Sequence, residues 1–228
     1  MDQLKLSYDD GWKPKYLHFL AAALIAVYLT TNVIAAKQAD LFGFVVTAGT
    51  LTFPFVLVLG DVISEIYGYK RSRQVIFSGF FAMIFFVVIT QLALLLPSAP
   101  NWSNQSDYEK VLGIIPRIIF ASLTTYIVSD LVNAFIMSRM KIIQKGKGFA
   151  SRAVFSTVVA QAVDGLVFYP LAFWGIIPTA VLVEIFFTSW IIKVALEVLA
   201  LPVTTLVVKH IKKLEGIEHF DEKPKQAS

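Results

Sequence analysis

FPFVLVLGDVISEIYGYKRSR, residues 53–73, is an apolar run that holds two acidic residues and ends in a basic cluster at 70–73. Asp61 and Glu65 stand four positions apart, and residues with that spacing lie on one face of an α-helix. A charge in the centre of a membrane-spanning helix costs about 2.5–3.5 kcal/mol on insertion scales, so such residues face a bundle interior or a wet cavity. The stretch therefore predicts a membrane helix with one polar face.

The composition of the whole chain is that of a membrane protein. Of its 228 residues, 57% are hydrophobic and only 16% are charged, whereas a soluble domain carries about 25% charged residues. Several apolar runs reach the roughly 20 residues that cross a bilayer as a helix. We therefore predict an all-α integral membrane protein. The chain has no cysteine, which excludes disulfides, thiolate metal sites and a cysteine nucleophile.

Six membrane-spanning helices are predicted, in one membrane domain over residues 17–208. Residues 1–16 form an N-terminal segment before it, and residues 209–228 form a polar tail after it. The spans are expected at about residues 17–36, 45–67, 75–96, 114–137, 153–174 and 179–208.

Two of these spans are expected to be irregular. The second contains Gly43, Gly49, Pro54 and Gly60 around its first half, which indicates a broken or re-entrant start and a helix that can bend. The last is about 30 residues long and contains Pro202. Proline removes a helical hydrogen bond, so a kink or tilt is predicted there.

The distribution of basic residues predicts the orientation. With six spans, 16 of the 20 lysines and arginines fall in the two ends of the chain and in the loops that follow spans two and four. An even number of spans places these four segments on one side, and cytoplasmic loops carry the excess of basic residues. Both termini are therefore expected in the cytoplasm.

Four of the spans carry polar residues at helical spacing. A stripe of polar groups, often with an aromatic residue, is what a central binding site for a solute requires. The stripes are Asp61 and Glu65; Tyr126, Asp130 and Asn133; Gln161, Asp164 and Phe168; and Trp190, Lys193 and Glu197.

Structural explanations for several of these residues remain open. Lys193 and Glu197 are four apart and can neutralise each other. Glu65 lies close to Lys70 in the sequence, so these two can form a positioning pair at the cytoplasmic interface. Asp130 can serve helix packing through a hydrogen bond.

Two further residues of the last two spans are expected to be structural. Glu184 lies near the outer end of the last span, where an acidic side chain is tolerated. Gly165 follows Asp164 and allows close approach of a neighbouring helix.

The chain lacks the motifs of the common enzyme classes, so no enzyme activity and no cofactor are predicted. It has no phosphate-binding GxxxxGK[ST] loop and no HExxH zinc motif. Its histidines are His18, His210 and His219, and only His18 lies near a span. The arrangement favours transport over catalysis.

Four stretches of the chain carry a resemblance to a known family: TTNVIAAK (30–37), FPFVLVLGDVISEIYGYKRSR (53–73), QAVDGLVFYPLAFWG (161–175) and KVALEVLALP (193–202). They resemble the queuosine precursor transporter family, earlier labelled a putative vitamin uptake family. The resemblance extends over about residues 17–208 and implies a six-helix importer of the inner (plasma) membrane. Its fold would resemble the substrate-binding subunits of energy-coupling-factor vitamin transporters, and its substrates would be 7-deazaguanine bases, the cyano and aminomethyl precursors of queuosine.

The resemblance also suggests which residues act. A carboxylate can accept from the ring NH and the exocyclic amine of a deazaguanine together, and Asp164 is the first candidate for that role. The resemblance assigns no direct ligand role to Glu65 or Glu197. Substrate-binding candidates are Asn32, Lys37, Phe53, Asp61, Asp130, Gln161, Asp164, Phe168, Trp190 and Lys193, and structural or gating candidates are Pro54, Gly60, Glu65, Gly68 and Pro202.

The resemblance implies that different residues of the candidate site contact different parts of the base. Gln161 or Asn32 would meet the carbonyl and pyrrole edge, and Phe53, Phe168 or Trp190 would stack on the ring. A second carboxylate would favour the cationic aminomethyl base, with Asp61 and Asp130 as its candidates. Lys193 would pair with a site carboxylate and keep it ionised.

Three functional classes remain open at this point. The first is a carrier that works alone, by secondary transport or facilitated diffusion, and supplies tRNA queuosine modification. The second is a substrate-binding subunit that needs a separate ATPase module. The third is a membrane assembly factor without a solute. The expected partners are the solute and the lipid bilayer, with no direct nucleic-acid contact, and the small residues at 21–23 permit a homodimer.

Overall fold

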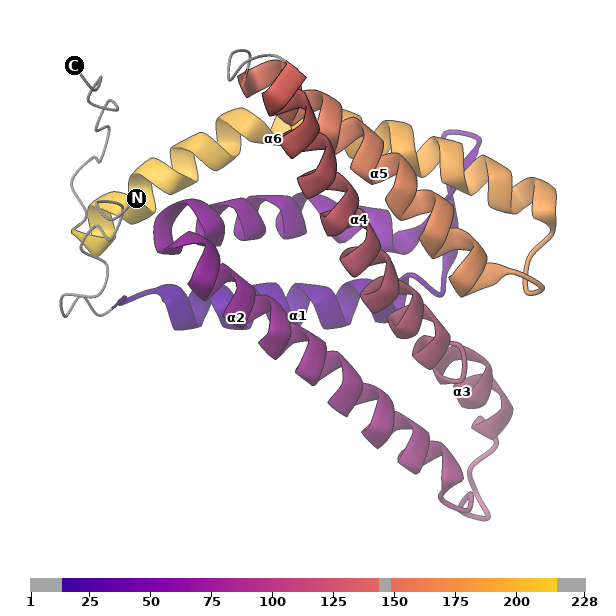
Figure 1. Cartoon of the computed structure of the whole chain (residues 1–228). Helices are drawn as coiled ribbons and strands as arrows, with labels where there is room; N and C mark the ends of the chain where they lie inside the picture. Colours follow the sequence, from indigo (N-terminus) through magenta and orange to yellow (C-terminus); the bar gives the residue numbers. More distant parts are fainter. Residues whose placement is uncertain (1–13, 144–148, 217–228) are drawn as a thin grey trace, which may run out of the picture.

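The structure of the chain is a computed structural model that describes residues 14–143 and 149–216. Helices dominate it, with one short β-hairpin (Figure 1). In chain order the elements are α1 (Leu17–Ile34), β1 (Gln38–Leu41), β2 (Phe44–Thr47), the 3₁₀ helix η1 (Ala48–Thr52), α2 (Phe53–Leu95), α3 (Gln105–Leu112), α4 (Ile115–Ile143), α5 (Phe149–Phe173) and α6 (Thr179–Glu215).

The described residues contain six helical segments that are long and apolar enough to cross a membrane, which confirms the predicted six-helix, all-helical membrane architecture. Large apolar side chains on these helices point outward; Phe81, for example, is 72% exposed. Such a surface is stable against lipid tails, which are as apolar as the side chains themselves. The segments are Leu17–Ile34, Ala48–Gly68, Lys70–Leu95, Gln105–Ser129, Phe155–Phe173 and Thr179–Glu215.

The second and third spans form one helix with a sharp bend at Gly68. This residue has φ 76° and ψ 168°, and it interrupts the helical dihedral angles of α2. Only glycine adopts this backbone region without strain. Pro54 lies in the first turn of α2, and the bend does not occur at Gly60. Figure 1 shows the first half of α2 alongside α1 and the second half leaving in another direction.

The second span does not begin at Val45 as the sequence predicted, because residues 38–47 form a two-stranded antiparallel hairpin. Phe42 and Gly43 both have positive φ, of 55° and 87°, as the tightest hairpin turns require. The hairpin is tied to α6, since the Val45 N–H donates to Glu184 Oε1 at 3.0 Å. This bond confirms the expected structural role of Glu184.

The last helix continues to Glu215, seven residues beyond the predicted end of the sixth span. The Glu215 side chain is buried and accepts hydrogen bonds from the backbone N–H groups of Lys15 and Tyr16. It also accepts a bond from the Tyr67 hydroxyl at 2.7 Å. One carboxylate thus joins the start of α1, the bend of α2 and the end of α6.

A second contact between α2 and α6 lies at the same end of the molecule. Glu65 forms an ion pair with Lys212 at 2.9 Å, and not the pair with Lys70 that the sequence left open. The helical end of α2 before its bend is therefore held by the last turns of α6. Residues 217–228 of the predicted polar tail lie outside the described residues.

Helices α5 and α6 approach each other closely beside the candidate site. A Cβ added to Gly165 would lie 2.7 Å from the ring of Phe186, a distance that real side chains do not tolerate. This contact confirms the expected role of Gly165 in close helix approach. The α5–α6 turn is fixed by Arg117 of α4, whose guanidinium donates to the carbonyl oxygens of Leu171 and Trp174 at 2.7 Å.

Candidate functional site

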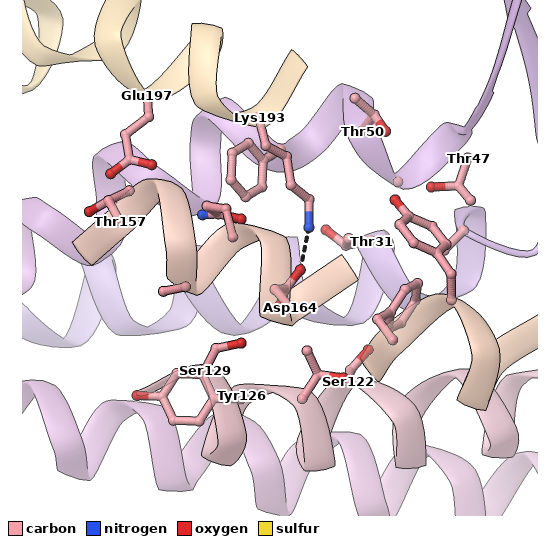
Figure 2. A pocket seen from close by; sticks show the side chains of 18 residues that line it. Thr31, Thr47, Thr50, Ser122, Tyr126, Ser129, Thr157, Asp164, Lys193 and Glu197 are labelled. Atoms are coloured by element: carbon pink, nitrogen blue, oxygen red, sulfur yellow. Dashed lines mark hydrogen bonds and ion pairs between the residues drawn. The ribbon is translucent and has the colours of Figure 1, made fainter. Parts of the chain in front are cut away.

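A cavity of about 400 Å³ lies between the helices. Its lining comes from α1, β2, η1, the start of α2, α4, α5 and α6, so it collects side chains from segments that are far apart in the sequence (Figure 2). The volume falls within the range of about 300–1,000 Å³ that is usual for small-molecule sites. The cavity is therefore large enough to hold a small organic molecule.

The charged centre of the cavity is the pair of Asp164 on α5 and Lys193 on α6. Lys193 Nζ lies 2.6 Å from Asp164 Oδ2, and the two side chains are 17% and 28% exposed, lysine first. Lys193 Nζ also lies 5.2 Å from the centre of the Phe53 ring, within the range of a cation–π contact. Figure 2 shows both charged heads pointing into the cavity between α5 and α6. The pair links the two helices and presents a donor and an acceptor together.

Three buried oxygen atoms on the lining residues have no hydrogen-bond partner among the described residues. They are Thr125 Oγ1 and Ser129 Oγ on α4, and Glu197 Oε2 on α6. A buried polar group without a partner costs about 1–3 kcal/mol. The two hydroxyl groups can donate hydrogen bonds to a polar solute or accept them from it, and the carboxylate oxygen can accept them.

Aromatic rings supply the flat surfaces of the cavity. Phe53, Tyr126, Phe168 and Tyr169 all line it. Phe168 meets Tyr169 edge to face, with 5.3 Å between the ring centres. Flat apolar faces beside a few polar groups favour a planar heterocyclic ligand.

Five of the ten predicted substrate-binding residues come together in the lining. They arrive from three helices that are far apart in the sequence: the start of α2, α5 and α6. They are Phe53, Gln161, Asp164, Phe168 and Lys193.

Four of the other predicted residues lie outside the lining. Asn32 is buried, donates to Tyr28 O, and accepts a bond from Ser122 Oγ at 2.7 Å. Because Ser122 lines the cavity, Asn32 positions a lining residue. Trp190 donates to Val158 O and stacks on Phe186, so it joins α6 to α5.

Lys37 and Asp61 are exposed and also lie outside the lining. Asp130 belongs to α4, and its side chain is outside the part of the chain that the structure describes. Its predicted role as a second carboxylate therefore stays a prediction.

The sequence analysis missed several lining residues. Glu197 lies one helical turn after Lys193 in a predicted polar stripe. It was not predicted as a substrate-binding residue, because the same spacing allowed Lys193 and Glu197 to neutralise each other. Thr125 and Ser129 are also four residues apart, on one face of α4, and this spacing was the signal that could have identified them. Thr47 enters the lining from the hairpin, an element that the sequence analysis did not predict.

Comparison with known proteins agrees with a transport site. The putative vitamin uptake transporter family matches residues 47–207, which include the last residue of β2, all of η1 and α2, and all the lining residues on α4, α5 and α6. No solved structure matches the chain significantly.

Three curated relatives carry the same functional name. A probable queuosine precursor transporter of Bacillus subtilis (strain 168) is 29% identical over 172 residues, 75% of each chain. The queuosine precursor transporter of Escherichia coli (strain K12) is 23% identical over 167 residues, 73% of each chain. A probable queuosine precursor transporter of Haemophilus influenzae is 25% identical over 146 residues, 64% of this chain and 60% of the relative. With six apolar helical segments and a cavity that collects polar and charged side chains, the chain is a multi-pass membrane protein that belongs to the putative vitamin uptake transporter family, the family of the queuosine precursor transporters.

Proposed function

We propose that this protein imports a 7-deazaguanine precursor of queuosine across the cytoplasmic membrane, as a carrier that works without an ATPase. The observation that carries the proposal is the cavity around Asp164 and Lys193, in a chain whose relatives are named for queuosine precursors. Both termini are cytoplasmic in this proposal, as the distribution of basic residues predicts.

The chemistry of a deazaguanine matches the groups in the lining. The base is flat, so Phe53 and Phe168 can cover its faces. Its carbonyl oxygen accepts from a donor such as the Lys193 ammonium, and its ring N–H and exocyclic amine donate to an acceptor such as Asp164. Charge-assisted bonds of this kind are about twice as strong as neutral ones. Gln161 carries both a donor and an acceptor and completes the recognition of the edge.

The structure of α2 suggests how access to the cavity changes. The helix starts at the cavity with Phe53 and bends at Gly68, and its end before the bend is held by Tyr67–Glu215 and Glu65–Lys212. Movement of this first half against α6 would open the cavity toward the side that carries these contacts. Pro202 lies inside α6 and removes one hydrogen bond from that helix.

Transport into liposomes tests the proposal. The purified protein alone is reconstituted, and entry of a radiolabelled 7-deazaguanine base is measured with guanine as competitor. We expect saturable entry that Asp164→Ala abolishes, while Asp107→Asn, a change at an exposed carboxylate on α3, leaves it unchanged. Binding without entry would favour an ATPase-dependent subunit, and absence of both would exclude the proposed substrate.

A further inference from the structure

The carboxylate of Glu197 has a different environment from that of Asp164. Asp164 is neutralised by Lys193 at 2.6 Å. Glu197 lies four residues beyond Lys193 on α6, yet its Oε2 is buried and has no hydrogen-bond partner among the described residues. In Figure 2 its carboxylate lies over Thr157 of α5, apart from the Asp164–Lys193 pair. The mutual neutralisation of Lys193 and Glu197 that the sequence left open does not occur.

The charges around the cavity do not balance. Among the described lining residues, two carboxylates, Asp164 and Glu197, face one ammonium, that of Lys193. An ionised Glu197 therefore leaves uncompensated negative charge in a region of low dielectric, which is costly until a cation lies beside it.

The spacing of the two charged positions suits a bicyclic base. Four residues of α-helix separate Lys193 and Glu197 by about 6 Å along the axis. A base whose carbonyl edge meets the Asp164–Lys193 pair would extend along α6 toward Glu197, between the rings of Phe53 and Phe168. A positively charged substituent at that end of the base would meet Glu197.

We propose that Glu197 determines substrate specificity by binding the ammonium group of an aminomethyl-bearing deazaguanine, so that the cationic precursor is taken in preference to the neutral cyano precursor. The inference rests on the proposed function and names the form of substrate that the site selects. The cyano group carries no positive charge and no donor, so it leaves Glu197 uncompensated. Cation binding beside a carboxylate stabilises both charges.

Competition between the two bases tests this inference. In the liposome assay, KM is measured for the aminomethyl and the cyano base with wild-type protein, Glu197→Gln and Glu197→Asp. We expect a lower KM for the aminomethyl base in the wild type. Glu197→Gln, which keeps the shape and removes the charge, should raise that KM roughly tenfold or more and change the KM of the cyano base less than about threefold. Glu197→Asp should retain most of the preference.

Controls separate this inference from general damage and from the proposed function itself. Glu109→Gln changes an exposed carboxylate on α3 and should alter neither KM. An equal effect of Glu197→Gln on both bases, or no effect on either, would overturn the role of Glu197 while leaving the transport function standing. Failure of the wild type to bind either base would instead overturn the proposed function.

A measurement on the wild type covers the case in which Glu197→Gln does not fold. Binding to the native state raises its apparent stability by an amount that grows with the logarithm of the affinity at a given ligand concentration. The aminomethyl base should therefore raise the Tm of the detergent-purified protein more than the cyano base does at equal concentration. An equal or reversed order would contradict the inference.

Discussion

At the scale of single residues, the site depends on a pair of charged side chains that are mostly buried. Asp164 and Lys193 are mostly buried and lie in contact. Breaking a buried pair by removing one partner is strongly destabilising because the other charge is left uncompensated, whereas removal of both is far less harmful. The same two residues face the cavity, so their contributions to folding and to transport can be separated by experiment.

Neutral substitutions of this pair should separate stability from uptake. We expect Asp164→Asn and Lys193→Gln each to cost about 3 kcal/mol of unfolding free energy, and the double variant to recover a large part of it. Uptake should be lost in all three, because the charged groups that meet the base are gone. Thermal unfolding in detergent and uptake into liposomes measure the two effects. The exposed pair of Asp107 and Lys110 is the control, since its removal should cost less than about 1 kcal/mol.

A second prediction at this scale concerns Gly165. A methyl group at this position would lie 2.7 Å from the Phe186 ring, so Gly165→Ala forces α5 and α6 apart or moves the ring. Overpacking of this kind costs about 1–3 kcal/mol. We expect a lowered Tm, with partial recovery when Phe186→Leu is combined with Gly165→Ala. A double variant as unstable as the sum of the single variants would show that Phe186 is not the obstacle.

At the scale of elements, the bend in α2 is the feature that shapes the bundle. It converts one continuous helix into two spans that leave Gly68 in different directions (Figure 1). The bend lies beside Tyr67, whose hydroxyl bonds to Glu215 at the end of α6. The position of the bend is thus fixed both by the backbone freedom of glycine and by a contact with the far end of the chain.

Alanine substitutions at two glycines of α2 should distinguish this bend from the rest of the helix. Gly68→Ala places a side chain at φ 76°, which costs about 1–3 kcal/mol, and we expect a lower Tm and reduced uptake. Gly60 lies in helical backbone, and an added Cβ there meets nothing within 4 Å. Gly60→Ala should therefore be neutral or slightly stabilising. Equal effects of the two substitutions would contradict a special role for Gly68.

At the scale of the whole molecule, the six apolar segments decide which loops share one side of the membrane. Lys110, on α3, follows the third span, and Lys70 lies at the junction of the second and third spans. These two exposed lysines are therefore predicted on opposite sides of the bilayer. The lipid-facing surface is built from outward apolar side chains such as Phe81, Phe120 and Leu199.

Cysteine labelling tests this orientation directly, because the chain contains no cysteine of its own. We expect Lys110→Cys to react with a membrane-impermeant maleimide in intact cells, and Lys70→Cys to react only after permeabilisation. The reverse pattern would mean that the chain is inverted. Reaction of both in intact cells would contradict the placement of a span between them.

Much of the architecture followed from local features of the sequence. Hydropathy over about 20 residues decides whether a segment can span a bilayer, because every backbone polar group must be satisfied within the segment. The six spans were predictable for that reason, and so were Gln161, Asp164, Phe168 and Lys193 as residues that face one cavity. Their spacing placed each on a polar face, and charged residues of membrane helices face the bundle interior. Phe53 was predicted only from the family resemblance.

The pairing of these residues was decided only by the tertiary structure. Lys193 had two candidate carboxylates, one at four residues on its own helix and one at 29 residues on α5, and packing of α5 against α6 at Gly165 selected Asp164. Glu65 likewise pairs with Lys212 of α6 rather than with Lys70. Sequence spacing defines the face of a helix that a charge occupies, but its partner depends on which other helix is packed there. Because Lys193 pairs with Asp164, Glu197 has no cation beside it in the described part of the chain. In our proposal, this is why the site favours a positively charged base.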